Sequence, residues 1–271
     1  MSSAEHRAPD PAPPEAPLVY ITGASSGIGQ ALAARYHRAG YRLALVARRR
    51  AEMIRWAAAS RVPDAGFAVY GADVRDVAAI TDAGRRCILA QGLPDVVIAN
   101  AGVSVGMDSA DLADLDVMRA AYETHNLGMA ATFQPFIDAM RARGSGALVG
   151  VASVAGLRGL PGHAAYCSSK AATISYCESL RGELRASGVE VVTLVPGYID
   201  TPLTRGNRYA MPFLMSAPAF ADRAFAAIEA GASYRVIPWQ MAVVAWTLRR
   251  LPNAVFDRLL QGRPRKRKRN E

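Results

Sequence analysis

The sequence predicts an α/β fold in which one doubly wound parallel sheet lies between two helical layers (α/β/α) as a single domain. Six short runs are rich in β-branched and aliphatic residues, as in strands buried on both faces; they cover residues 18–22, 41–47, 66–72, 95–99, 146–152 and 189–195. The segments between them, notably 28–39, 75–90, 111–143 and 165–187, are long enough for crossover helices. No repeat or linker divides residues 18–230. Such strand–helix alternation builds a sheet of this kind through right-handed crossovers.

The two ends of the chain differ in composition from its body. Residues 1–17 contain five prolines and no apolar run, which predicts a disordered extension rather than a signal peptide or an anchor. We expect the main domain over 18–237, a helical extension over 238–262 and a basic tail over 263–271. The tail holds six basic residues and one acidic residue, so the net charge of +9 is only +4 without it. Because the basicity is largely in the tail, nucleic-acid binding is not expected.

The three cysteines, Cys87, Cys167 and Cys177, lack the spacing of a metal site. An odd number of free thiols is typical of a reducing cytosol. The apolar stretch 241–246 is far shorter than the ~20 residues that span a bilayer. We therefore expect a cytoplasmic protein without a bound metal.

The loop after the first predicted strand reads TGASSGIG, residues 22–29, and leads into a helix. Doubly wound sheets bind ligands outside the carboxyl ends of their strands. The glycines allow a tight turn and close approach of a ligand, while the helix N-terminus offers free N–H groups to a pyrophosphate. No Gly-Lys-Ser/Thr sequence follows, so this is not a P-loop. We interpret it as a dinucleotide-binding loop, with contacts from Gly23, Ser25, Ser26, Gly27, Ile28 and Gly29.

The second predicted strand ends in VARRR. Dinucleotide folds that prefer NAD place an acid at this point, where it accepts hydrogen bonds from the adenosine ribose. Ala47 stands where that acid is expected, and Arg48 and Arg49 follow. A carboxylate would repel a 2′-phosphate, whereas an arginine would bind one. The sequence thus predicts NADP(H) as the preferred cofactor, with NAD(H) as the alternative.

Four motifs together resemble those of the classical short-chain dehydrogenase/reductase family. They are TGASSGIG at 22–29, NAG at 100–102, YCSSK at 166–170 and PGYIDT at 196–201, in the family's order. The resemblance covers roughly residues 18–230 and implies a Rossmann-type fold and an oxidoreductase that interconverts a carbonyl and a secondary alcohol. It further implies that adenine lies beside Asp73 and Val74. The residues implied to support the cofactor or border its nicotinamide are Asn100, Ala101, Gly102, Pro196, Gly197, Ile199 and Thr201.

A catalytic tetrad is implied by the same resemblance: Asn126, Ser153, Tyr166 and Lys170. Tyr166 and Lys170 are four residues apart, so on a helix they share a face. Ser153 follows the fifth predicted strand and would hold the substrate oxygen while Tyr166 transfers the proton. We expect Lys170, together with an oxidised nicotinamide, to lower the pKa of the tyrosine and to hold the nicotinamide ribose. By the family's pattern, Asn126 holds a water of a proton relay.

Three further side chains lie next to the predicted tetrad in the sequence. His125 and Cys167 are interpreted as packing residues. His163 precedes the predicted catalytic helix and either packs or touches substrate.

The segment 203–220 would determine the substrate, since family members differ there. Its Met211, Phe213, Leu214 and Met215 are interpreted as an apolar lid, although they suit a core equally well. We expect an apolar or lipid-derived small-molecule substrate. The alternative is a catalytically silent dinucleotide-sensing protein on the same scaffold.

Two further expectations concern partners. The family's pattern implies a homo-oligomer, a dimer or larger, through helices in 111–143 and 165–187. Residues 239–269 depart from the family's common ending and combine tryptophans with basic residues. We rank packing over the pocket or a dimer seam first, with peripheral contact to the inner face of a membrane as the alternative.

Overall fold

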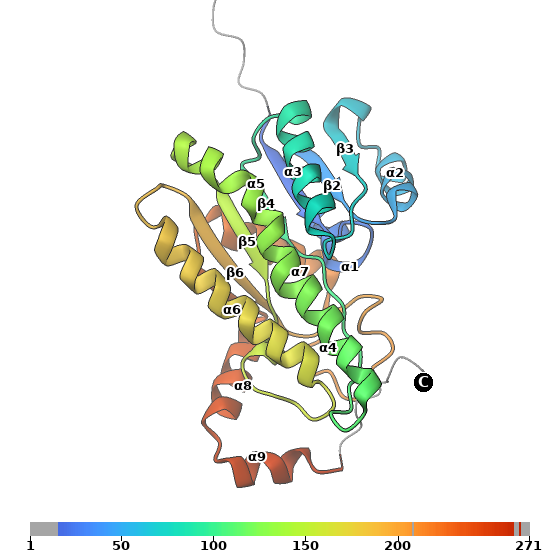
Figure 1. Ribbon diagram of the computed structural model, residues 1–271, viewed down its shortest axis with the longest axis vertical. Coiled ribbons are helices and arrows are strands. Elements are labelled where there is room, and N and C mark those ends of the chain that lie inside the picture. Colours follow the sequence, from blue (N-terminus) through green and yellow to red (C-terminus); the bar gives the residue numbers. More distant parts are fainter. Residues whose placement is uncertain (1–15, 208, 263–265, 267–271) are drawn as a thin grey trace, which may run out of the picture.

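The computed structural model describes residues 16–207, 209–262 and 266. The proposed N-terminal extension, except residues 16 and 17, and the basic tail, except Lys266, lie outside them. A seven-stranded sheet forms the centre of the molecule (Figure 1). Its strands are β1 (Leu18–Thr22), β2 (Arg42–Val46), β3 (Phe67–Tyr70), β4 (Val96–Ala99), β5 (Ala147–Val151), β6 (Glu190–Pro196) and β9 (Tyr234–Ile237).

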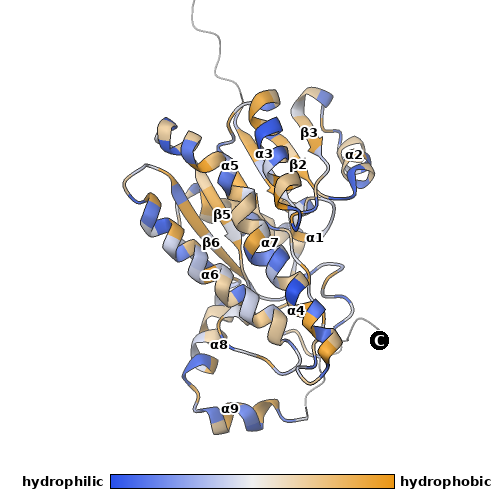
Figure 2. Cartoon of the chain, in the orientation of Figure 1, coloured by the Kyte–Doolittle hydropathy of each residue, from blue (hydrophilic) through white to orange (hydrophobic). Residues whose placement is uncertain are grey.

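All seven strands are parallel, in the spatial order β3-β2-β1-β4-β5-β6-β9. The order reverses between β1 and β4, which is the switch point where a doubly wound sheet opens a crevice for ligands. Figure 2 shows the central strands as hydrophobic along their length, as expected for strands covered on both faces. The predicted fold class and all six predicted strands are therefore confirmed.

Helices cover both faces of the sheet. One face carries α1 (Gly27–Arg38), α2 (Arg50–Ala59) and α7 (Ala217–Glu229), packed around Leu32, Tyr36 and Phe220. The other carries α3 (Val77–Gln91), α5 (Gly128–Arg143) and α6 (Ala164–Leu184), around Phe133 and Phe136. These five side chains are fully buried, so each face has its own apolar core.

The predicted helix over 111–143 is divided into α4 (Leu115–Tyr122), a π-helical turn (Glu123–Leu127) and α5. A π-helical turn inside a helix is frequent at functional sites. The remaining elements are β7 (Ile199–Asp200), β8 (Met215–Ser216), α8 (Trp239–Arg250) and α9 (Asn253–Leu260). Within the described ranges, each helix is too short or too polar to cross a bilayer.

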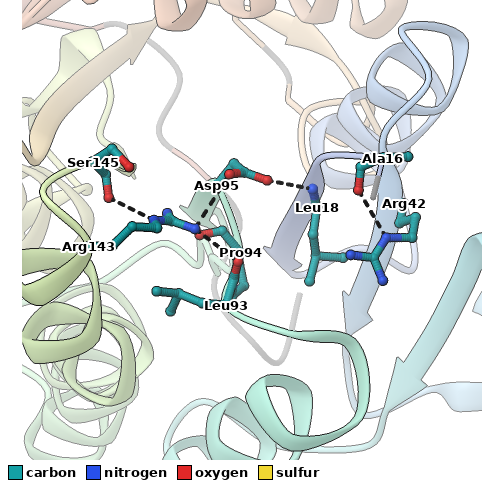
Figure 3. Close-up of polar contacts among 8 residues, drawn as sticks. All are labelled: Ala16, Leu18, Arg42, Leu93, Pro94, Asp95, Arg143 and Ser145. Atoms are coloured by element: carbon teal, nitrogen blue, oxygen red, sulfur yellow. Dashed lines mark hydrogen bonds and ion pairs between the residues drawn. The ribbon is translucent and has the colours of Figure 1, made fainter. Parts of the chain in front are cut away.

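Polar contacts tie together the edge of the sheet opposite the carboxyl ends (Figure 3). The Asp95 carboxylate accepts the backbone N–H of Leu18 at 2.8 Å. Arg143, at the end of α5, lies 3.5 Å from the same carboxylate and donates to the Pro94 carbonyl at 2.7 Å. These contacts fasten β1, β4 and α5 to one another and so hold the first strand in its place.

Candidate active site

A cleft of about 630 Å³ opens at the carboxyl ends of β1, β2, β4 and β5. Loops that follow the strands form its wall. Most of the predicted site residues line it: Gly23, Ser25, Ser26, Gly27, Ile28, Arg48, Arg49, Asp73, Val74, Asn100, Ala101, Gly102, Tyr166, Lys170, Pro196 and Thr201.

The glycine loop has the shape that a pyrophosphate requires. Gly23 and Gly27 have φ angles of +68° and +57°, a region in which other residues are strained. A Cβ on Gly23 would lie 2.9 Å from the Cα of Ala101, so a side chain there would collide with the opposite wall. Helix α1 begins at Gly27, and its first turn lacks a side-chain cap. Its N–H groups are therefore available to an anion, and the loop fits a dinucleotide.

Three arginines surround the end of the cleft beyond β2 and β3. Arg49 donates to the hydroxyl of Ser25 at 3.0 Å, so its guanidinium reaches back over the glycine loop. Arg75 forms a close pair with Asp73 at 2.8 Å, and Arg48 lies 3.7 Å from the same carboxylate. These contacts, chiefly the hydrogen bond from Arg75, hold the pKa of Asp73 below its usual value. Arg49 also pairs with Glu52 at 3.2 Å. Two carboxylates therefore face three guanidinium groups, and the net charge at this end is positive.

Arg75 was not predicted as a site residue, although it lines the cleft. It lies two residues after Asp73 in the loop beyond β3, and the sequence could have indicated it only through this proximity. Its pairing with Asp73 leaves the guanidinium of Arg48, whose side chain is 65% exposed, as the more accessible cation.

Tyr166 lines this cleft and lies close to Ser153. The Ser153 hydroxyl lies close enough to the phenol to lower its pKa, and Ser153 Oγ accepts the N–H of Ala155 at 3.2 Å. That bond fixes the position of the serine oxygen at the end of β5. Lys170, one turn after Tyr166 on α6, donates to the carbonyl of Val151 at 2.8 Å. The structure thus brings a phenol, an alcohol and an amine together at one sheet edge.

The pKa of Tyr166 differs from expectation in the cofactor-free protein. Burial raises it, and the hydrogen bond from Ser153 offsets this only in part. Burial also lowers the pKa of Lys170 to about 7, since an ammonium in an apolar surrounding loses hydration. Lys170 Nζ lies 6.0 Å from the centre of the tyrosine ring and bonds to a carbonyl instead. The expected lowering of the Tyr166 pKa is therefore not present in the cofactor-free protein, and it would require a further positive charge such as the oxidised nicotinamide.

Asn126 lies in the π-helical turn, and its amide nitrogen donates to the carbonyl of Ser169 at 3.0 Å. Its Oδ1 is buried and lacks a hydrogen-bond partner among the described residues. This acceptor is compatible with the relay water that the family pattern implies.

His125 has a structural position beside the same turn. Its Nε2 accepts the N–H of Val103 at 3.0 Å, so Nδ1 carries the proton and donates to Ser169 Oγ at 2.8 Å. Burial holds its pKa well below the usual value, and the ring stays neutral. These bonds agree with the packing interpretation, and they fasten the loop after β4 to α6.

Three predicted cofactor contacts lie behind the cleft wall rather than on it. Gly29 packs on the loop itself, where a Cβ would lie 2.4 Å from the Gly23 oxygen. Gly197 packs on α8, where a Cβ would lie 2.7 Å from the side chain of Met241. Ile199 is buried in the core. At Gly29 and Gly197 the absence of a side chain lets other elements approach closely, which a motif match cannot distinguish from direct contact.

The cleft is also lined by the aliphatic side chains of Val105, Val117, Ala120, Ala121 and Leu203. Residues 211–215, interpreted as an apolar lid, are not among the residues that line the cleft: Phe213 and Leu214 are about half exposed, and Met215 forms β8. Another residue of the segment 203–220, Tyr209, contacts His163 instead. Tyr209, which the sequence analysis missed, has its hydroxyl 3.3 Å from Nε2 of the buried His163.

Comparison with known proteins fits this geometry. The family described as short chain dehydrogenase matches residues 17–211, which is well over half of the chain. The chain belongs to this family. An uncharacterized oxidoreductase of Myxococcus xanthus is 38% identical over 239 residues, covering 88% of this chain and 93% of its own length.

Solved structures share the fold of this short-chain dehydrogenase. An alcohol dehydrogenase of Thermococcus sibiricus in complex with 5-hydroxy-NADP has a TM-score of 0.74 at 24% identity, covering 82% of this chain and 96% of its own. A short-chain dehydrogenase/reductase of Burkholderia phymatum in complex with NAD has a TM-score of 0.77 at 22% identity, covering 85% and 92%. The protein is an oxidoreductase that acts on CH–OH groups with a nicotinamide dinucleotide as cofactor.

Proposed function

We propose that this short-chain dehydrogenase interconverts an apolar carbonyl compound and its secondary alcohol with NADP(H), and that Tyr166 transfers the proton. The observation that carries the proposal is that Tyr166 and Lys170 line the dinucleotide cleft at the end of β5, where Ser153 follows the strand. When bound, the nicotinamide supplies the hydride for reduction or accepts it in the reverse direction.

Each tetrad residue has a distinct task in reduction. The Ser153 hydroxyl donates a hydrogen bond to the substrate oxygen as negative charge develops on it. Tyr166 gives its phenolic proton to that oxygen. When protonated, Lys170 has two further N–H donors beyond its bond to Val151, and these would hold ribose hydroxyls. Asn126 Oδ1 accepts a hydrogen bond from a water that returns a proton toward Lys170.

The preference for NADP(H) is supported by charge at the adenosine end. Ala47 stands where an acid would repel a 2′-phosphate, and Arg48 and Arg49 line the cleft beside it. Arg49 is already held by Ser25, so two hydroxyls and a guanidinium converge on one anion-binding corner.

An apolar substrate is supported by the aliphatic side chains that line the cleft, among them Val105, Val117 and Leu203. Apolar walls favour binding in proportion to the apolar area that leaves water. The test is NADPH oxidation with aldehydes, ketones and acyl ketones of increasing chain length, with NADH in parallel. We expect turnover with NADPH and a KM that falls as the chain lengthens. NADPH binding without turnover of any compound would instead favour the dinucleotide sensor.

We further propose that the protein is a homodimer or larger. Leu112, Leu115 and Leu127 are half to largely exposed on and just before α4 and in the π-helical turn, a concentration of apolar surface that an interface would cover. Light scattering at micromolar concentration should give at least twice the mass of one chain, and a monomer would contradict the proposal.

A further inference from the structure

Helix α8 has two different apolar faces. Met241 and Ala245 are buried against the body of the protein. On the opposite side, Trp239, Val243 and Trp246 follow at a spacing of four and three residues and so form one stripe. These three side chains are 66%, 55% and 58% exposed. A helix that only packed over the pocket would not require large apolar residues on its solvent side.

Helix α9 repeats this arrangement at the lower end of the molecule (Figure 1). Phe256 is buried, while Val255 and Leu259 are 46% and 48% exposed and are four residues apart. We call Trp239, Val243, Trp246, Val255 and Leu259 the outer apolar set.

Positive charge is concentrated in the same part of the chain. Residues 238–271 contain nine Lys and Arg against two Asp and Glu, a net +7 out of +9 for the whole protein. Arg249 and Arg250 end α8, and the guanidinium of Arg250 lies 3.9 Å from the ring centre of Trp246. The basic residues therefore lie next to the outer apolar set as well as beyond it in the sequence.

This combination distinguishes between possible partners. A second copy of the chain would bring another net +7 against the first, and like charges in an interface are unfavourable. An anionic membrane surface meets both requirements, because tryptophan and aliphatic side chains enter its headgroup region while Arg and Lys attract its phosphates. We propose that α8 and α9 dock the protein on an anionic membrane.

The proposed docking helices are fastened to the loop between Ser153 and Tyr166. Arg158 in that loop donates to the carbonyls of Leu248 and, at 2.9 Å, Leu251, which end α8. Its guanidinium also lies 3.9 Å from the ring centre of Phe256 on α9. In return, Arg249 donates to the Leu157 carbonyl at 2.8 Å.

Lys266, the described residue of the basic tail, also contacts the cleft wall. Lys266 Nζ donates to the carbonyl of Leu203 at 3.2 Å, and Leu203 lines the cleft. Docking would thus place the cleft mouth beside the lipid. The consequence that an apolar substrate enters from the membrane rests on the proposed function, whereas docking itself does not.

The first test is co-sedimentation of the full chain with phosphatidylcholine vesicles and with vesicles that also contain phosphatidylglycerol, at low and high salt. We expect salt-sensitive binding to the anionic vesicles. Trp239→Ser with Trp246→Ser, and separately a chain that ends at Gly262, should each lower the partition coefficient at least about tenfold. Leu89→Ser is the matched control, because Leu89 is 86% exposed on α3, and it should bind as wild type does.

The second test reports on the tryptophans directly. The chain has three, so Trp56→Phe leaves Trp239 and Trp246 as the reporters. Vesicles with brominated acyl chains should quench their fluorescence. NADPH binding, measured for each variant, establishes that the fold is intact.

Three outcomes would overturn the proposal. One is full binding to anionic vesicles by the double tryptophan variant, and another is the lack of quenching in bound protein. The third is a change from dimer to monomer in that variant without vesicle binding by the wild type, which would assign the surface to a second copy. If the wild-type protein binds the vesicles but turns over none of the carbonyl compounds, the result counts against the proposed function alone.

Discussion

Lys170 on α6 donates a hydrogen bond of 2.8 Å to the carbonyl of Val151, the last residue of β5. The two residues are 19 positions apart in the sequence. Ser153 follows two residues after that carbonyl, and Tyr166 precedes the lysine by one helical turn. The bond therefore sets the position of the helix that carries the phenol relative to the strand that carries the alcohol. It also buries the amine, which lowers its pKa to about 7.

This buried amine predicts a pH dependence of stability in the cofactor-free protein. Between pH 7 and the ordinary lysine pKa of 10.5, the unfolded chain binds a proton at Lys170 that the folded chain does not. The unfolded state thus binds more protons, so the free energy of unfolding rises with pH across this window. Below it, both states are protonated and the full cost of burying the charge remains.

Urea unfolding of wild type and Lys170→Met between about pH 7 and pH 9 checks this. The free energy of wild type should rise relative to that of the methionine variant as the pH increases. Arg181→Met, an exposed position on the same helix, should show no such relative change. If the difference in the free energy of unfolding between wild type and Lys170→Met does not change with pH, the burial argument is contradicted.

The cofactor preference should depend on Arg48. Arg48→Asp replaces attraction with repulsion at a 2′-phosphate, so KM for NADPH should rise by about tenfold or more while KM for NADH changes little. The exposed Arg55 of α2 supplies the control, Arg55→Asp, which changes the net charge equally but lies outside the residues that line the cleft. Equal affinity of the unaltered protein for NADPH and NADH would show that the arginines do not select the phosphate.

Asp95 should matter for stability although it lies far from the cleft. Asp95→Ala leaves the Leu18 N–H without its acceptor and Arg143 without its carboxylate (Figure 3). We expect a loss of about 1–2 kcal/mol in the free energy of unfolding. Asp138→Ala removes a carboxylate that is 96% exposed, 3.9 Å from Arg141, and should cost less than about 0.5 kcal/mol. Similar values for the two variants would contradict the bracing role of Asp95.

Much of this architecture could be predicted from the sequence because apolar runs mark doubly covered strands directly. The strands β1 to β6 were found in this way, and the motifs after them line one cleft because parallel strands end at one edge. Strand β9, whose Tyr234 and Arg235 are exposed, was not predicted. It lacks the strong apolar pattern on which such prediction depends.

The contacts that tune the site were beyond prediction for a different reason. The pairing of Arg75 with Asp73, the reach of Arg49 to Ser25 and the closeness of Tyr209 to His163 depend on side-chain rotamers and loop paths. The pKa of Tyr166 likewise depends on how deeply the closed fold buries it, and here burial outweighs its hydrogen bond from Ser153. A residue pattern shows which groups come together, but it does not show how far each group is buried from solvent.

The most direct test of the account is Tyr166→Phe, which removes the proton-bearing oxygen and leaves the ring in place. Turnover with the best carbonyl substrate and NADPH should fall about 10³-fold, while the Kd for NADPH stays within about threefold of wild type. Tyr176→Phe on the same helix, where the ring stacks near Phe133, should keep its activity. Turnover of Tyr166→Phe within a few-fold of wild type would contradict the assignment of the proton to this tyrosine.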